Sequence, residues 1–195
     1  MFKKLTHAAL LTAVAASLST AALAAPVTYK IDNSHTYPRF SYNHLGYSTQ
    51  LSRFDKTEGT VVFDQAAKTG EVDITIDVDS VQTGNDTFNG HLKGEKFFDV
   101  KQFPTATFKS TKVVFEGDKP ASIEGDLTIK GVTKPVTLKV THFAEKEHPM
   151  LKRSAIGADA ETVVKRSDFD MGANVPHVSD EVTISIALEA VSQEE

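Results

Sequence analysis

Residues 71–79 alternate between apolar and polar side chains without interruption, and no other feature of the chain constrains the fold as strongly. Val72, Ile74 and Ile76 fall on one face of an extended strand, and aspartate and threonine side chains fall on the other. A period of two places one strand face against a core and the opposite face in water. The segment therefore predicts a strand in a sheet that is solvated on one side.

Similar alternation recurs along the chain, separated by short turns such as Lys130-Gly131 that allow antiparallel hairpins. About nine segments are predicted as strands, near residues 27–31, 37–44, 58–64, 72–79, 106–116, 122–130, 135–143, 153–161 and 181–190. An open sheet of this size would leave unprotected edges, and closure removes them. We therefore predict an all-β fold, an antiparallel β-barrel of about eight strands or slightly more.

Residues 83–100 interrupt this series of strands. Asn85 or Asp86 is suited to cap a helix, and Phe88 and Leu92 have the i, i+4 spacing of one helix face. The segment predicts a short helix beside the barrel.

The first 24 residues have the composition of a targeting segment. Two lysines precede an uncharged apolar stretch, residues 8–23, and the pattern Ala22-Leu23-Ala24 follows the small-x-small rule for cleavage. The stretch is rich in Ala, Ser and Thr, so we expect no stable membrane span. The sequence predicts a cleavable signal peptide over residues 1–24 and one domain over residues 25–195.

Composition excludes several classes of function. The chain has no cysteine, which rules out disulfides, thiolate catalysis and cysteine-ligated metal centres. The net charge is -5, and the 21 Lys and Arg residues are dispersed, so a nucleic-acid partner is not expected.

Several blocks of sequence carry a resemblance to a known family. They are Asp32-Asn33-Ser34-His35 followed by Phe40-x-Tyr42-x-His44-Leu45-Gly46, then residues 80–85, 91–93, 97–100, 103–110 and 125–136, and finally Arg166-Ser167-Asp168-Phe169. In this order and spacing they resemble the YceI-like family of bacterial lipid-binding proteins. The resemblance covers essentially all of residues 25–195. Asp170 departs from the pattern, because the family usually has glycine there, and this leaves the local loop geometry open.

The resemblance implies a lipocalin-like barrel, extended beyond the usual eight strands and carrying a helix. It also implies an apolar interior that holds one long lipid, such as a polyisoprenoid or a polyprenyl quinone like ubiquinone, and no other cofactor. Homodimers are common in the family. With the predicted signal peptide, the resemblance implies a non-enzymatic periplasmic lipid carrier or store.

An isoprenoid tail is held by burial of apolar area, which needs no charged groups. The candidate lining residues are Phe40, Tyr42, Phe63, Ile74, Ile76, Leu92, Phe97, Phe108, Leu127, Ile129, Leu138, Val140, Ile156 and Phe169. For each of them, ordinary core packing is the alternative.

A lipid head group needs polar partners at one end of the cavity. The candidates placed by the family blocks are His35, His44, Arg166 and Asp168. The alternative for His44 is a histidine satisfied by backbone at a strand end. For Arg166 and Asp168 it is a structural ion pair or a contact that locks a loop.

Motifs for catalysis and metal binding are absent from the sequence. There is no helical zinc motif, nucleophile elbow or phosphate-binding loop, and we predict no metal site. Two other hypotheses stay open. One is a metal- or haem-dependent periplasmic enzyme, with a site assembled from His35, His44 and His142. The other is a structural or stress protein with a solid core.

Overall fold

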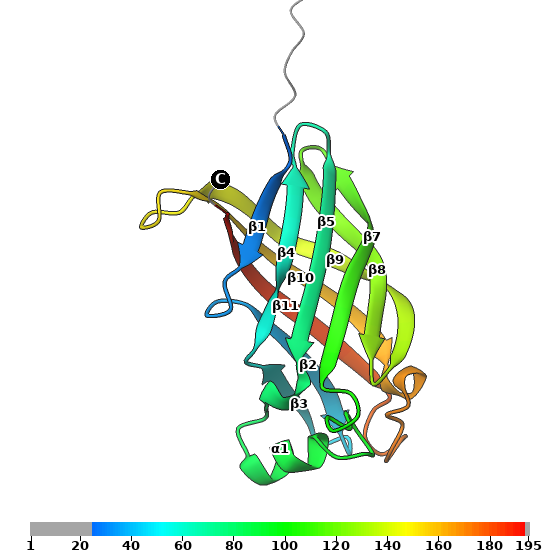
Figure 1. Ribbon diagram of the computed structural model, residues 1–195. Coiled ribbons are helices and arrows are strands. Elements are labelled where there is room, and N and C mark those ends of the chain that lie inside the picture. The colour runs from blue at the N-terminus through cyan, green and yellow to red at the C-terminus, as the bar shows by residue number, and fades with distance from the viewer. Residues whose placement is uncertain (1–24, 194–195) are drawn as a thin grey trace, which may run out of the picture.

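The computed structural model describes residues 25–193 and shows an antiparallel sheet that closes into a barrel (Figure 1). Eight strands form the closed ring, because the last strand pairs with the first. In ring order they are β1 (Val27–Ile31), β4 (Thr57–Asp64), β5 (Thr69–Asp77), β7 (Thr105–Glu116), β8 (Lys119–Ile129), β9 (Val132–Glu147), β10 (Ser154–Lys165) and β11 (Glu181–Ser192). The prediction of an all-β barrel is confirmed. The predicted signal peptide, residues 1–24, lies outside the described residues.

Three further strands extend the sheet beyond the ring. They are β2 (Tyr37–His44), β3 (Ser48–Phe54) and β6 (Val81–Gln82), and β2 joins the barrel by pairing with β11. Strand β3 was not among the predicted segments. Its sequence has only two apolar residues, Leu51 and Phe54, so it shows no alternating pattern.

Strand β11 holds two partners along one edge. Ala190, near its end, pairs with Ile31 of β1, whereas Ala187 pairs with Tyr37 of β2. The chain between β1 and β2, residues 32–36, therefore lies opposite the middle of this edge.

Helix α1 (Asp86–Leu92) and two short 3-10 helices, η1 (Val78–Ser80) and η2 (Arg166–Phe169), complete the fold. The side chain of Asn85 caps α1 by accepting a hydrogen bond from the amide of Phe88 at 3.0 Å, and the predicted short helix is confirmed. In Figure 1 this helix lies at the same end of the barrel as β2 and β3. Within residues 25–193, no helix is long and apolar enough to cross a membrane.

The alternating strands turn their apolar faces inward, as their sequences predict. Val72 and Ile74 of β5 are buried in the same core as Phe108 and Leu127 of the neighbouring strands. Gly125 of β8 is required here, because a Cβ atom at this position would lie 2.5 Å from Cζ of Phe108. The glycine allows the phenylalanine ring to lie across the strand.

Asp170 ends η2 in the left-handed conformation, with φ of 57°. Glycine adopts this conformation without cost, and aspartate is one of the few other residues that tolerate it. Lys130 Nζ also donates to the carbonyl oxygen of Asp170 at 2.8 Å. The aspartate therefore keeps the backbone geometry that a glycine would adopt at this position.

Candidate ligand-binding site

The barrel contains a cavity of about 310 Å³. This volume is at the lower end of the range for small-molecule sites. Only three of its lining residues carry a formal charge, namely Arg39, Glu71 and Arg166. A cavity of this kind binds a molecule through apolar burial and can give polar contacts at a few points.

The fourteen side chains predicted to line a cavity all lie on its wall. They come from seven strands, from α1 and its following loop, and from η2, and they are Phe40, Tyr42, Phe63, Ile74, Ile76, Leu92, Phe97, Phe108, Leu127, Ile129, Leu138, Val140, Ile156 and Phe169. Their contact with a ligand stays a prediction.

Other lining residues were missed. Phe54, Phe98 and Phe143 contribute rings to the wall, and Ile184 and Ile186 contribute the inward face of β11. The alternation of β11 was visible in the sequence and could have indicated the last two. Phe54 and Phe98 lie in segments without a strand pattern, so no periodic signal marked them.

Aromatic rings gather at the end of the cavity near β2 and β3. The ring centroids of Phe40, Phe54 and Phe98 lie 5.5–6.0 Å apart, within the range of favourable aromatic contact. A second group lies on other strands, where Phe63 is 5.1 Å from Phe143 and 5.9 Å from Phe115.

Arg166 reaches the cavity wall from η2 and is buried, with 8% of its surface exposed. Its guanidinium donates to the carbonyl oxygens of Ser179 at 2.9 Å, Ala173 at 2.7 Å and Val178 at 3.0 Å, and also to that of Met171. Burial lowers the pKa of the Arg166 guanidinium from its usual value. The arginine therefore fixes the conformation of the loop that follows η2, which is the structural alternative predicted for Arg166 from the sequence.

The Arg166 charge is not neutralised by an ion pair among residues 25–193. The neighbouring Asp180 accepts hydrogen bonds from Ser167 instead, at 2.9 Å from its amide and 2.7 Å from its hydroxyl. These bonds hold the pKa of Asp180 below its usual range. A guanidinium has five N–H groups, and four are used on carbonyls, so one donor on Nη2 remains.

His44 and Tyr42 lie on the cavity wall beside this arginine. His44 ends β2 and forms an isolated backbone bridge with Val178, one of the residues whose carbonyl Arg166 holds. Burial raises the pKa of the Tyr42 hydroxyl, and the nearby Arg166 charge partly offsets this effect. Of the four head-group candidates, His44 and Arg166 are therefore the two that reach the cavity.

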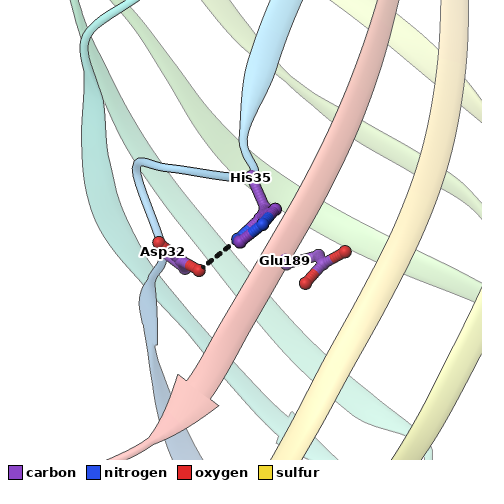
Figure 2. Close-up of side chains that lie close together, drawn as sticks. All are labelled: Asp32, His35 and Glu189. Carbon is purple, nitrogen blue, oxygen red and sulfur yellow. Dashed lines mark hydrogen bonds and ion pairs between the residues drawn. The ribbon is translucent and has the colours of Figure 1, made fainter.

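His35 and Asp168 do not line the cavity, which corrects the expectation that the four polar candidates share one end of it. Asp168 is exposed on η2. His35 lies on the exposed turn between β1 and β2, where its Nδ1 is 2.7 Å from Oδ2 of Asp32 (Figure 2). His35 lies next to Glu189, which is exposed on the outer face of β11 between the inward-facing Leu188 and Ala190.

Asp32, His35 and Glu189 are close enough to share an ion, with one ligand atom from each within 4.8 Å of the others (Figure 2). Among the described residues, this is the group with that geometry, and neither His44 nor His142 belongs to it. The structure therefore does not assemble the three-histidine site of the enzyme hypothesis. The group is on the surface, and Asp32 and His35 form a hydrogen bond directly with each other.

Comparison with known proteins agrees with this architecture. The family model described as the YceI-like domain matches residues 29–190. Protein YceI of Salmonella arizonae is 37% identical over 183 residues, which cover 92% of this chain and 95% of the relative.

Solved structures share the fold. BcnA of Burkholderia cenocepacia gives a TM-score of 0.71 at 29% identity, covering 82% of this chain and 99% of that chain. The Campylobacter jejuni YceI protein gives 0.67 at 30% identity, covering 78% and 90%. A polyisoprenoid-binding domain from Saccharophagus degradans gives 0.65 at 18% identity, covering 86% and 99%, and this likeness concerns the fold alone.

A closed antiparallel barrel around an apolar cavity defines the class of this protein, which is a lipocalin-like barrel. Within that class, the chain belongs to the YceI-like family.

Proposed function

We propose that this protein binds a long-chain isoprenoid or a related amphiphilic lipid, such as a polyprenol or a polyprenyl quinone, inside the barrel. The observation that carries the proposal is the cavity of about 310 Å³ with an almost wholly apolar wall. A structural protein with a solid core would fill this space with side chains, because protein interiors pack closely. The Saccharophagus degradans neighbour, described as a polyisoprenoid-binding domain, offers a precedent within the same fold.

The head group of the lipid would lie at the Arg166 end of the cavity. Arg166 there has one N–H beyond those used on the loop carbonyls, and His44 and Tyr42 lie on the same wall. An oxygen atom of an alcohol, phosphate or quinone would accept a hydrogen bond from the guanidinium. This bond is strengthened by charge and by the low dielectric of the site.

We further propose that binding serves lipid transport or storage in the periplasm. The predicted signal peptide over residues 1–24 supports that location. Cell fractionation tests it directly, and mass spectrometry of the isolated protein should find an N-terminus at Ala25. A protein that retains residues 1–24 in the cytoplasmic fraction would contradict the location.

The lipid itself is tested by extraction. Protein purified from a bacterial host should release a long-chain apolar compound into organic solvent, identified by mass spectrometry. A purified protein that releases none, and that takes up neither prenyl quinones nor polyprenols from detergent, would overturn the proposal.

A pair of variants on β10 links the lipid to the cavity. Ala158 lines the cavity, and Ala158→Phe adds a ring to the space that the lipid would occupy. Val163 lies on the outer face of the same strand and is 58% exposed, so Val163→Phe is a matched control. We expect Ala158→Phe to retain much less lipid than the wild type and Val163→Phe to retain the same amount. Equal retention by the two folded variants would place the lipid elsewhere.

A further inference from the structure

Two segments that lie at one end of the barrel lack charged residues, although 24% of the sequence is charged. Residues 40–52 and residues 171–179 contain no Asp, Glu, Lys or Arg. The first segment forms most of β2, the turn after it and most of β3, and the second is the loop that follows η2. We call these two segments the uncharged rim.

The two segments lie side by side at one end of the barrel (Figure 1). The amide of Leu45 donates to the carbonyl oxygen of His177 at 3.0 Å, and the amide of Ser179 donates to that of Asn43 at 3.0 Å. These bonds join segments that are more than 130 residues apart in the sequence, so the rim is one continuous surface.

The uncharged rim exposes large apolar side chains. Tyr47 is 88% exposed, Leu51 60%, Leu45 47% and Val175 38%. These four are half of the exposed large hydrophobic residues among residues 25–193. Apolar groups gathered on one exposed surface indicate an interaction site, because covering them releases free energy.

The other side of the same loops faces the cavity. His44, Asn174 and Val178 line it, while Leu45, Tyr47 and Val175 beside them face outward. A molecule that leaves the cavity at this end would therefore pass between groups of the uncharged rim.

We propose that the uncharged rim docks on the surface of a phospholipid bilayer, so that the cavity exchanges its lipid directly with the membrane. The proposal rests on the proposed function, because a long isoprenoid is held in membranes and a carrier must contact one to load. An absence of charge and the presence of an exposed tyrosine suit the interface of a bilayer, where amphipathic rings are favoured.

The test is flotation of purified protein with phosphatidylcholine vesicles. Tyr47→Asp and Leu51→Asp each place a charge in the rim without changing a residue of the cavity wall. We expect each to lower the partition coefficient about tenfold or more, because the substitution removes apolar area that docking would bury and adds a charge that would lose its hydration. Thermal unfolding verifies that each variant is folded. If one variant does not fold, the other still tests the proposal.

Met150→Asp is the matched control. Met150 is 83% exposed in the turn between β9 and β10, at the opposite end of the barrel from the uncharged rim. Its substitution should leave flotation unchanged. Flotation that falls equally in this control and in the rim variants would overturn the proposal.

Vesicle composition gives a second criterion. The chain has a net charge of -5 and the rim has no cation, so binding should not need anionic lipid. Flotation that requires phosphatidylglycerol would overturn the proposal. So would light scattering that shows a dimer converted to a monomer by Tyr47→Asp, because the rim would then be an interface between two copies of this chain.

The two proposals fail in different ways. Lipid content is measured by mass spectrometry on the same samples that are floated. A protein that retains an isoprenoid but does not float overturns docking and leaves lipid binding in place. A protein that floats but holds and takes up no lipid overturns the proposed function.

Discussion

The hydroxyl of Thr36 donates to the carbonyl oxygen of Glu189 and also accepts a hydrogen bond from the amide of Glu189, each at 3.1 Å. Glu189 is in the part of β11 that lies between its pairings with β1 and β2. The Thr36 side chain, together with the Asp32 amide that donates to the same carbonyl at 2.9 Å, thus replaces the hydrogen bonds that a continuous partner strand would make. Thr36 is buried, with 1% of its surface exposed, so water does not substitute for it.

Thr36→Val tests the hydrogen bonds between Thr36 and β11 at this junction of the barrel. Valine keeps the shape of threonine but removes the hydroxyl, which leaves the Glu189 amide without the partner that the buried Thr36 side chain provides. We expect the free energy of unfolding to fall by about 1–3 kcal/mol, measured by urea denaturation. Thr36→Ser, which keeps the hydroxyl, should lose less, and a valine variant as stable as the wild type would contradict this role.

Arg166→Met tests the loop lock. The substitution removes four hydrogen bonds to carbonyls of residues 171–179. We expect a loss of about 3 kcal/mol in urea denaturation, since hydrogen bonds to a charged group are worth more than neutral ones. Asp168→Asn on the same 3-10 helix changes an exposed side chain and should stay within about 0.5 kcal/mol of the wild type. If Arg166→Met is as stable as this control, the arginine does not hold the loop.

Two substitutions at Asp170 distinguish the contribution of the backbone conformation to stability from that of the side chain. Asp170→Ala and Asp170→Gly both remove the ion pair with Lys130, whose Nζ is 3.3 Å from Oδ2 of the aspartate. Only alanine also opposes the left-handed conformation. We expect the glycine variant to be more stable than the alanine variant by about 1 kcal/mol, measured by thermal unfolding. Equal stabilities would mean that the loop changes conformation.

His35 and Asp32 make stability depend on pH. The hydrogen bond that His35 donates to the Asp32 carboxylate raises the pKa of His35 above its usual value, and the pKa of Asp32 is lowered mainly by the same bond. The His35 contribution is complete below the ordinary pKa of 6.5 and is lost as pH rises through the raised value. The Asp32 contribution is present above the ordinary pKa of 3.8 and is lost as pH falls through the lowered value.

His35→Gln should therefore destabilise the protein more at about pH 5.5 than at about pH 9. Urea denaturation at the two pH values measures the difference. His142→Gln, an exposed histidine outside this turn, is the control. The same loss for His35→Gln at both pH values would show that the pair does not contribute through its charge.

Ionisation of Tyr29 makes the stability of the barrel depend on pH in the alkaline range. Its hydroxyl is bonded to Glu145 at 2.7 Å and to Ser154 at 3.1 Å, and burial raises its pKa to about 12. The unfolded chain ionises this group from an ordinary pKa of 10.0, so the stability that it provides is lost as pH rises from there through about 12.

Tyr29→Phe removes that ionisation together with the two hydrogen bonds. We expect a loss of about 1–2 kcal/mol at neutral pH and a smaller decline of stability above about pH 10 than in the wild type. Thermal unfolding across this range measures both. A decline as steep as that of the wild type would assign the alkaline transition to another group.

The sequence predicted the strands of the barrel because alternation is a local property. Each of Val72, Ile74 and Ile76 faces the cavity for the same reason that it falls on one face of an extended chain. Strand β3 escaped prediction because it lies outside the closed ring and needs no continuous apolar face. Its apolar Leu51 is exposed, which no pattern in the sequence explains.

The polar part of the site could not be predicted from the same signal. His35 and His44 occur in neighbouring blocks, yet one lies on an outer turn and the other on the cavity wall. The difference depends on where β11 takes its two partners, and that is a pairing between segments about 150 residues apart. Similarly, Arg166 was a candidate both for the head group and for a structural role, and its four carbonyl partners were needed to show the second.

The sequence by itself determined the strands of the closed ring, their inward faces and the membership of the family, because period, turn chemistry and block order are properties of contiguous residues. Only the tertiary structure decided which polar groups reach the cavity and that two uncharged segments, residues 40–52 and 171–179, form one rim. The physical reason is that these relationships arise where distant strands close the barrel. Closure is set by packing and hydrogen bonds across the whole ring, which no local pattern contains.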